Sequence, residues 1–510
     1  MEYNLSKHNI SYAHDFLDTV NEQIVDVDIT LPDYCPDIEK ILKCNLIPKI
    51  YSKKISGGQL SIEGISCIRV MYCDSIRHSI RCYEQTVPFT ATFNLKSTPE
   101  QYVVLTDTKC EYINCRALSP RKLVVHGAFS LYAKVICKDY IELFSYEEDD
   151  DLQVKHKDYE VSDLCALCEE QFSVTEDVNV SSKPPVEALL SYEVTPRIID
   201  VKSIHNKVVL NAELTLHAMY ISDLEKCSVE HISYVFPINR IIDCENVSDN
   251  TLCVPVLSVM SYDLHIKNDT LSDGSTLTLD VKLNFCETGY HKKTVRLIED
   301  CYSTKYHTNQ KKRGVNCETN HRYETLSHIM KSSVNFDNMK ISRILNIVDD
   351  SLTLTPVLSD NKLSFNGKTN ICILLEDDEN NIHYIERIVD VSFTPEVAFD
   401  YDRVQKNSCI INSISYRLIG DSEIELRLEL RVGVVLSNAV SANPVVLVER
   451  NDDSEIASDD SSLVLYFAQK GESIWEVAKM YSTKEAVLMD ENNLESSILE
   501  SPMMLLVPTE

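Results

Sequence analysis

The sequence predicts a mainly β protein, in which tandem antiparallel β-rich modules are followed by a small α+β unit. Three observations support this fold class. Stretches such as 277–285 and 424–432 alternate apolar and polar residues, pairs of such stretches recur along the chain, and helical periodicity becomes clear only after residue 470. Period-two alternation turns one face of a strand to a core and the other to water, as in an antiparallel sheet.

Pairs of predicted strands recur with similar polar as well as apolar residues. The matching pairs are 113–118 with 122–129, 199–204 with 207–214, and 357–358 with 362–367. Two shorter echoes are 261–264 with 415–418, and 88–90 with 392–394. We interpret these as about three divergent copies of one module, although any antiparallel protein repeats hairpins. The expected organisation is an N-terminal extension at 1–24, modules at 25–140, 185–290 and 340–440, a connector at 302–340, an acidic linker at 450–462 and a C-terminal domain at 463–510.

The overall charge excludes several classes of partner. The 510 residues contain 49 Lys and Arg against 79 Asp and Glu, a net charge of −30. So acidic a surface repels nucleic acid and anionic lipid, and we expect neither as a general partner. No stretch approaches the roughly 18 apolar residues of a membrane helix. The first 25 residues lack the apolar core of a secretion signal, so the simplest expectation is a cytosolic protein.

The 18 cysteines are too dilute for a disulfide scaffold. We expect them to be reduced thiols that act as small buried apolar groups. Cys165 and Cys168 form one CxxC pair, but a structural zinc site needs a second pair, and none follows at the required spacing. A metal or redox role for this pair is the alternative.

Sequence motifs of enzymes are missing. The chain has no GxxxxGK phosphate loop, no HExxH, no GxSxG and no GxGxxG, and its 14 histidines are scattered. We therefore expect a protein that is not an enzyme and has no cofactor and no metal. A hydrolase whose catalytic pair is assembled only by the fold is the alternative.

The last 48 residues change in pattern. A short β run at 463–467 is followed by Ser473, a good helix N-cap, with Glu476 placed to complete a capping box. Positions 474, 477, 478 and 481 then form one apolar stripe. This spacing predicts a first helix that packs on a strand.

A second helix is expected next. Thr483 can cap it, Val487 and Leu488 are expected to point inward, and Asn492 and Asn493 can end it because Asn tolerates a left-handed conformation. Residues 505–508 supply a second strand. The predicted order is strand, helix, helix, strand.

This C-terminal segment resembles a LysM domain. The resemblance rests on Gly471-Glu472-Ser473-Ile474-Trp475, Ala478, Tyr481, Thr483, Asn492, Leu494 and Leu505-Leu506-Val507-Pro508. It implies two helices on one face of a two-stranded sheet, and a groove between the loop after the first strand and the loop before the second. Many members of this family bind N-acetylglucosamine-containing glycans. The residues implied for partner or glycan binding are Lys470, Gly471, Glu472, Ser473, Trp475, Asn493, Leu494 and Met503.

Two positions bear on what such a groove would bind. The usual Gly before the last strand is replaced by the segment 501–504, which holds Met503 and Met504 and would suit an adaptable protein-binding surface. Trp475, the only tryptophan, is either a sugar-stacking or partner-anchoring ring, or a partly buried core ring at the start of the helix.

Residues 25–42 resemble the opening of the SPOCS domain, which is found in sporulation-associated proteins of spore-forming Firmicutes. The matching pattern is Asp-Ile, Leu-Pro, Pro-Asp-Ile and Ile-Leu. Four acidic residues in this stretch could hold a cation or could be turn formers: Asp26, Asp28, Asp33 and Asp37. We favour turn formers, because this proline-containing stretch does not show the loop geometry of a cation site.

Tandem SPOCS-like modules followed by a LysM-like segment are similar to the SipL family of clostridial sporulation proteins. The resemblance implies an adaptor in the mother-cell cytoplasm that binds a SpoIVA-type coat-morphogenesis ATPase through the LysM domain. It implies spore coat assembly around the forespore. Residues 463–510 hold eight acidic residues against three lysines, which would suit a basic patch on a protein partner. The alternative is a cell-wall or cortex protein that binds peptidoglycan.

Overall fold

The structure is a computed structural model of the 510-residue chain. It describes residues 5–146, 151–180, 183–225, 228–267, 276–336, 339–396, 400–456 and 463–508. Strands dominate throughout, and all paired strands are antiparallel, so the predicted mainly β class is confirmed. Among the described residues, no helix has both the length and the apolar character needed to cross a membrane.

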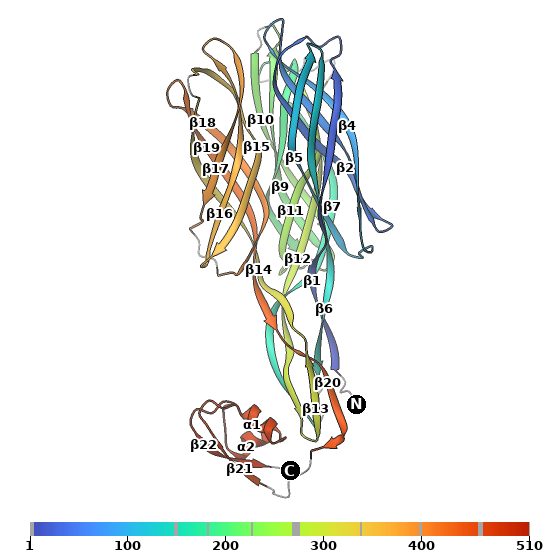
Figure 1. The fold of residues 1–510 in the computed structure, drawn as a ribbon, viewed down its shortest axis with the longest axis vertical. Coiled ribbons are helices and arrows are strands. Elements are labelled where there is room, and N and C mark those ends of the chain that lie inside the picture. The colour runs from blue at the N-terminus through green and yellow to red at the C-terminus, as the bar shows by residue number, and fades with distance from the viewer. Residues whose placement is uncertain are drawn as a thin grey trace.

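Three modules of identical topology make up most of the chain (Figure 1). The first contains β1 (Leu5–Thr30), β2 (Ile38–Ser56), β3 (Gln59–Asp74), β4 (Ile80–Asn94), β5 (Tyr102–Ser119) and β6 (Lys122–Tyr146). The second contains β7 (Leu152–Asn179), β8 (Ala188–Ile204), β9 (Lys207–Asp223), β10 (Ser228–Asp243), β11 (Leu252–Ile266) and β12 (Thr276–Ser303). The third contains β14 (Val315–Asn335), β15 (Ile341–Ser359), β16 (Lys362–Asp377), β17 (Ile382–Phe393), β18 (Arg403–Leu418) and β19 (Glu423–Ala442).

In each module the last strand lies between the first and the penultimate strand and pairs with both, and the other three strands form a second sheet. The sheet orders are β1-β6-β5 with β2-β3-β4, β7-β12-β11 with β8-β9-β10, and β14-β19-β18 with β15-β16-β17. The apolar faces of the two sheets meet in one core per module, around the fully buried Phe129, Phe285 and Phe365. The threefold recurrence supports the interpretation that the modules are copies of one unit.

One of the sequence matches was wrong in detail. The pair at 113–118 and 122–129 is the β5–β6 hairpin, whereas its two supposed partners lie in β8–β9 and β15–β16, whose counterpart is β2–β3. Every hairpin with one buried and one exposed face shows the same alternation of apolar and polar residues, whatever its position in the module. The alternation alone therefore could not identify which hairpins are counterparts. The echo between 261–264 and 415–418 does join counterparts, because it lies in β11 and β18.

Several expected boundaries also change. Residues 5–24 are not an extension but part of β1, which pairs with β6 along its length. The expected connector at 302–340 contains β13 (Tyr306–Lys312) and the whole of β14. The expected linker at 450–462 begins inside β20 (Val445–Glu455), and its residues 457–462 lie outside the described part of the chain. The strands in these three stretches contain many exposed polar residues, so their composition resembles that of loops.

The modules contact one another at counterpart positions. Met71, Met219 and Leu374 occupy the same place on the middle strands β3, β9 and β16, counted from the preceding hairpin turn, and all three are buried in one cluster. Burying large apolar side chains at an interface of this kind fixes the modules against one another.

Below the modules, long strands continue into a narrow stalk, which we define as residues 5–12, 139–146, 152–162, 292–312 and 445–455 (Figure 1). Ile10, Leu143, Val161, Val295 and other apolar residues pack there in a cluster of their own. At its lower end β13 pairs with β20.

The C-terminal unit, residues 463–508, lies beside the end of the stalk (Figure 1). It consists of β21 (Leu463–Ala468), α1 (Ile474–Met480), α2 (Glu485–Glu491) and β22 (Met503–Pro508), with β21 antiparallel to β22. This is the element order that the sequence predicts. Ile474, Val477 and Ala478 are buried, as the apolar stripe requires.

Three local details of this unit differ from expectation. Ser473 is the N-cap of α1, but its side chain makes no capping hydrogen bond, so no capping box forms. Lys484, not Thr483, is the N-cap of α2. Val487 is 39% exposed and only Leu488 is fully buried, because the short α2 places one narrow stripe inward. Asn493 has a positive φ of 55°, which matches the predicted left-handed helix end.

Candidate functional site

The loops that were expected to form a binding groove are joined to each other by backbone hydrogen bonds. The amide of Gly471 donates to the carbonyl of Leu499 at 2.8 Å, the amide of Leu499 donates back to Glu472 at 3.0 Å, and the amide of Ile474 donates to Ser497 at 2.8 Å. Gly471 has a φ of 89°, which a residue with a side chain rarely adopts. The two loops therefore form one continuous rim.

The predicted binding residues differ widely in exposure. Lys470, Gly471 and Asn493 are exposed. The half-buried members are Glu472, Ser473, Leu494 and Met503. Glu472 lies beside Tyr466, whose pKa is raised by burial and by that carboxylate. The rim thus offers a few side chains accessible to a ligand. The carboxylate of Glu472 is half-buried and interacts with Tyr466.

Trp475 lies apart from this rim. It is 3% exposed, and its indole nitrogen donates to Oδ2 of Asp300 at 2.9 Å. Asp300 belongs to β12, in the stalk, where the pairing with β7 shifts register between Ile298 and Asp300. Such an irregularity re-aims side chains. The tryptophan is therefore a buried ring that joins the C-terminal unit to the stalk, and in this state it offers no surface to a ligand.

Asp300 gathers further donors. Nζ of Lys479 lies 2.8 and 2.7 Å from its two carboxylate oxygens, and Nε2 of Gln310 lies 2.8 Å from Oδ1. Burial alone would raise the pKa of Asp300, but the hydrogen bonds from Lys479, Trp475 and Gln310 lower it overall. The carboxylate is thus charged and fully hydrogen-bonded, as a buried charge must be to be stable.

Tyr302 completes the contact between stalk and C-terminal unit. Its hydroxyl donates to the carbonyl of Thr483 at 2.7 Å, and its ring meets that of Trp475 edge to face, with centroids 4.9 Å apart. We call Asp300, Tyr302, Gln310, Trp475 and Lys479 the clamp. Because of the clamp, the C-terminal unit is a fixed part of the molecule and not a freely tethered domain.

Sequence reasoning missed the stalk half of the clamp. Asp300 and Tyr302 lie about 175 residues before their partners and in a stretch with no motif. The one available signal was the i, i+4 spacing of Trp475 and Lys479, which puts both on one helix face.

The acidic turn at the start of the first module is held by an arginine. Arg121 donates to Oδ1 of Asp37 at 2.8 Å and to the carbonyls of Pro32 at 2.6 Å and Cys35 at 3.0 Å. Asp26 contacts His126 instead, at 2.6 Å. These contacts support the turn-former interpretation for Asp33 and Asp37. It was wrong for Asp26 and Asp28, which lie in β1, where they pair with β6.

The CxxC pair is engaged with the backbone. The thiol of Cys165 donates to the carbonyl of Gly289 at 3.2 Å, and the thiol of Cys168 donates to that of Asp243 at 3.3 Å. Within the described ranges, no three His, Cys, Asp or Glu side chains are grouped so that they could hold a metal ion.

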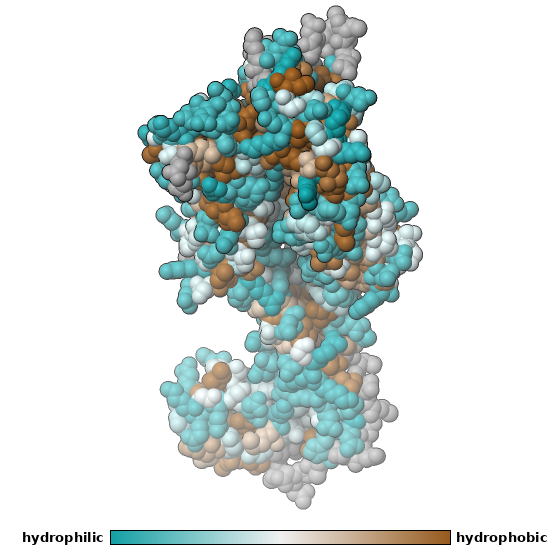
Figure 2. Space-filling model, turned by 45° about the horizontal axis from the view of Figure 1, so that its top comes forward, coloured by the Kyte–Doolittle hydropathy of each residue, from teal (hydrophilic) through white to brown (hydrophobic). Residues whose placement is uncertain are grey.

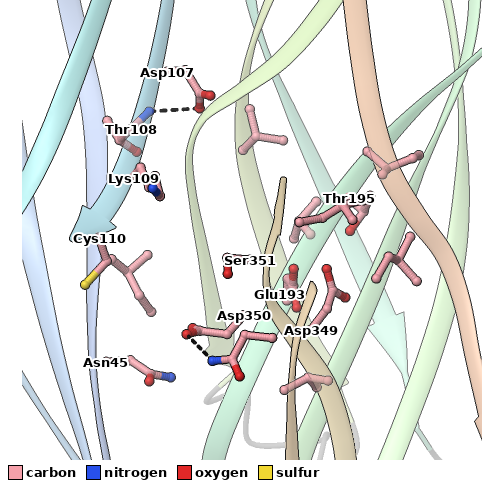
Figure 3. A pocket seen from close by; sticks show the side chains of 18 of the residues that line it. Asn45, Asp107, Thr108, Lys109, Cys110, Glu193, Thr195, Asp349, Asp350 and Ser351 are labelled. Carbon is pink, nitrogen blue, oxygen red and sulfur yellow. Dashed lines mark hydrogen bonds between the residues drawn. The ribbon is translucent and has the colours of Figure 1, made fainter. Parts of the chain in front are cut away.

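A cavity of about 2090 Å³ lies between the three modules (Figure 3). Glu193 of β8 and Asp349 of β15 face each other in it (Figure 3). Glu193 is exposed to the cavity, but desolvation by the surrounding modules, and then the charges of Asp349 and Asp350, raises its pKa to about 8. Desolvation also raises the pKa of Asp349 to about 6. The cavity also holds many lysines and polar groups, so its lining does not select one ligand chemistry.

Comparison with family models gives a match in the first two modules. The model described as SipL, SPOCS domain, matches residues 37–118 and 185–267. Two ranges of the chain are therefore similar, in tandem, to the SPOCS domain of SipL. The match indicates a sporulation-related protein. Neither the curated proteins nor the solved structures gave a match.

The two SipL-like ranges are structural counterparts. They cover β2 to β5 in the first module and β8 to β11 in the second. The same four positions in the third module are β15 to β18, which have the same topology but lie outside the match. In the second module the match covers residues 185–267, whereas the sequence comparison within the chain identified only the strand pair at 199–204 and 207–214 and the short segment at 261–264.

Proposed function

We propose that this SipL-like protein is a non-enzymatic sporulation adaptor, in which the C-terminal unit is a LysM domain that binds a SpoIVA-type coat-morphogenesis ATPase. Three SPOCS-like modules would act as the body of the adaptor. The proposed location is the mother-cell cytoplasm at the forespore surface, where the complex would promote coat assembly. The SPOCS match supports the link to sporulation, and the strand-helix-helix-strand order supports the LysM assignment.

The observation that carries this proposal is the fixed position of the C-terminal unit. The clamp attaches α1 of the unit to the stalk, while Lys470, Gly471 and Asn493 stay exposed. A unit that is held rigidly at the end of a long body can present one surface to a partner without paying to order it on binding. The acidic excess of residues 463–510 favours a partner with a basic surface.

The alternative function is binding of peptidoglycan or another N-acetylglucosamine polymer by the same unit. Its support is the LysM resemblance alone. Two observations favour the protein partner over the glycan: Trp475 is buried and cannot stack on a sugar, and Met503 and Met504 stand where a Gly is usual.

A binding experiment separates the two functions. The full chain is immobilised and exposed to a purified SpoIVA-type ATPase, and in parallel to soluble chitin oligomers. We expect saturable binding of the ATPase, weakened by Glu472→Gln with Asn493→Ala, because the change removes a negative charge that attracts a basic partner, and no binding of the oligomers at millimolar concentration. Binding of the oligomers without the ATPase would support the glycan function instead.

A further inference from the structure

The outer face of the β21–β22 sheet is apolar. The inward residues of β21 and β22 pack on the helices: Val464, Tyr466, Ala468, Leu505 and Val507. The residues between them point outward and are exposed to these fractions: Leu463 50%, Leu465 60%, Phe467 58%, Met504 55% and Leu506 37%. We call these five residues the outer face.

An antiparallel sheet with one solvated face normally carries polar residues there. Here every outward position of the two described strands from 463 to 467 and from 504 to 506 is a large apolar residue. Figure 2 shows hydrophobic surface along the lower border of the C-terminal unit. Large contiguous apolar surface on a folded protein marks an interaction site.

The clamp keeps the outer face free. Trp475 and Lys479 attach α1 to Asp300 in the stalk, and the helices lie on the side of the sheet that faces the rest of the molecule (Figure 1). The outer face therefore points away from the body. No movement of the unit is needed to expose it.

We propose that the outer face is the docking surface for a protein partner that presents an apolar patch flanked by basic side chains. This inference rests on the proposed function for the identity of the partner. It places the main contact on the β21–β22 sheet instead of on the rim at 470–473 and 493–494. Apolar contact supplies the affinity, and charge supplies the orientation and speed of association.

Charge decides between the candidate occupants. The residues from 463 to 510 carry eight acidic side chains and three lysines, and the chain as a whole has a net charge of −30. A second copy of this chain carries the same negative charge and would be repelled by the C-terminal unit. An anionic membrane would be repelled in the same way. A basic protein surface gains from this field, so it is the occupant that the charges favour.

The main test compares two variants of the full chain. Leu465→Thr with Phe467→Thr removes apolar contact but keeps residues that suit a strand. Ile241→Thr, at an exposed apolar position of β10, is the matched control. We expect the double variant to bind the SpoIVA-type ATPase at least about 10-fold more weakly, as for a central interface contact, and the control to bind like the wild type. Fluorescence of Trp475 confirms that the unit stays folded and clamped in both.

A second probe makes the result independent of that ATPase. A ten-residue peptide that alternates valine and lysine has an apolar face and basic charge, and one that alternates serine and lysine has the charge alone. We expect the first peptide to bind the wild type at least about 10-fold more tightly than it binds the double variant, and the second peptide to show no such difference.

The outcomes separate the two proposals. Loss of ATPase binding only in rim variants at Glu472 and Asn493 would leave the proposed function standing and overturn the outer face. Failure of the ATPase to bind, with the valine–lysine peptide still discriminating, would overturn the function alone. Self-association of the wild type in sedimentation, or binding to vesicles of phosphatidylcholine and phosphatidylglycerol, abolished in the double variant, would assign the face to a different occupant and contradict the inference.

Discussion

The indole nitrogen of Trp475 donates to Asp300 across the boundary between the C-terminal unit and the stalk, at 2.9 Å. Two segments 175 residues apart in the chain thereby share one buried polar contact. An unpaired buried polar group is costly, so removing either partner should loosen the unit. Because the protein has a single tryptophan, its fluorescence reports this contact directly.

Asp300→Ala is expected to weaken the clamp. The change leaves the indole NH and the Lys479 ammonium without their acceptor, at a cost of about 1–3 kcal/mol. We expect red-shifted tryptophan emission, because the ring becomes accessible to water. Asp390→Ala, at an exposed carboxylate of β17, should leave the spectrum unchanged. An unchanged spectrum in Asp300→Ala would contradict the clamp.

Tyr302→Phe separates the hydrogen bond from the ring contact. It removes the hydroxyl that donates to Thr483 and keeps the ring against Trp475. We expect a loss of about 0.5–1.5 kcal/mol in the urea unfolding of the C-terminal unit, followed by tryptophan fluorescence. Tyr302→Ala should cost about 3–5 kcal/mol, because it also leaves a cavity. Equal losses in the two variants would show that the ring contributes nothing.

Leu488→Ala and Val487→Ala test the observed face of α2. Leu488 is fully buried, so its truncation is expected to cost about 2–5 kcal/mol. Val487 is 39% exposed, and its truncation should change stability by no more than about 0.5 kcal/mol. Thermal unfolding of the unit, followed at Trp475, measures both. The opposite ranking would mean that α2 is rotated relative to this structure.

Glu193→Gln should change how stability depends on pH. The pKa of Glu193 is raised to about 8 in the folded protein, above the usual value of about 4.3 for an unfolded chain. The folded state therefore holds its proton more tightly, and the contribution of Glu193 to stability is full below about pH 4 and is lost as pH rises toward 8.

The measurement is the melting temperature at a series of pH values. From pH 5 to 8, the wild type should lose more stability than Glu193→Gln, and at pH 4 the two should be nearly equal. Glu160→Gln, which affects only an exposed ion pair with Lys292, serves as the control and should follow the wild type. Parallel curves for the wild type and Glu193→Gln would contradict the raised pKa of this carboxyl in the cavity between the modules.

The sequence predicts much of the architecture because local pattern determines it. Alternation at 277–285 and 424–432 identifies β12 and β19, and the helical stripe from Ile474 identifies α1. The predicted module boundaries are wrong where long strands extend from the modules into the stalk. There β1 and β7, of 26 and 28 residues, run on past the stretches whose alternation is readable.

The clamp and the outer face show two different limits of sequence reasoning. The partner of Trp475 depends on how β12 bends at residue 300, which no local pattern encodes. In the sequence, the outer face corresponds to the unbroken apolar run from Leu463 to Phe467. A short apolar run of this kind predicts a strand that is buried on both faces. Only the packing of both helices on the opposite side shows that half of this run is exposed.

The central claim is that the C-terminal unit carries the partner contact while the three modules support it. The most direct measurement is titration of a purified SpoIVA-type ATPase into the full chain and into a chain that ends at residue 456, by calorimetry under identical conditions. We predict saturable binding to the full chain and none to the shortened one. Equal affinity for the two chains would contradict the claim and place the contact on the SPOCS-like modules.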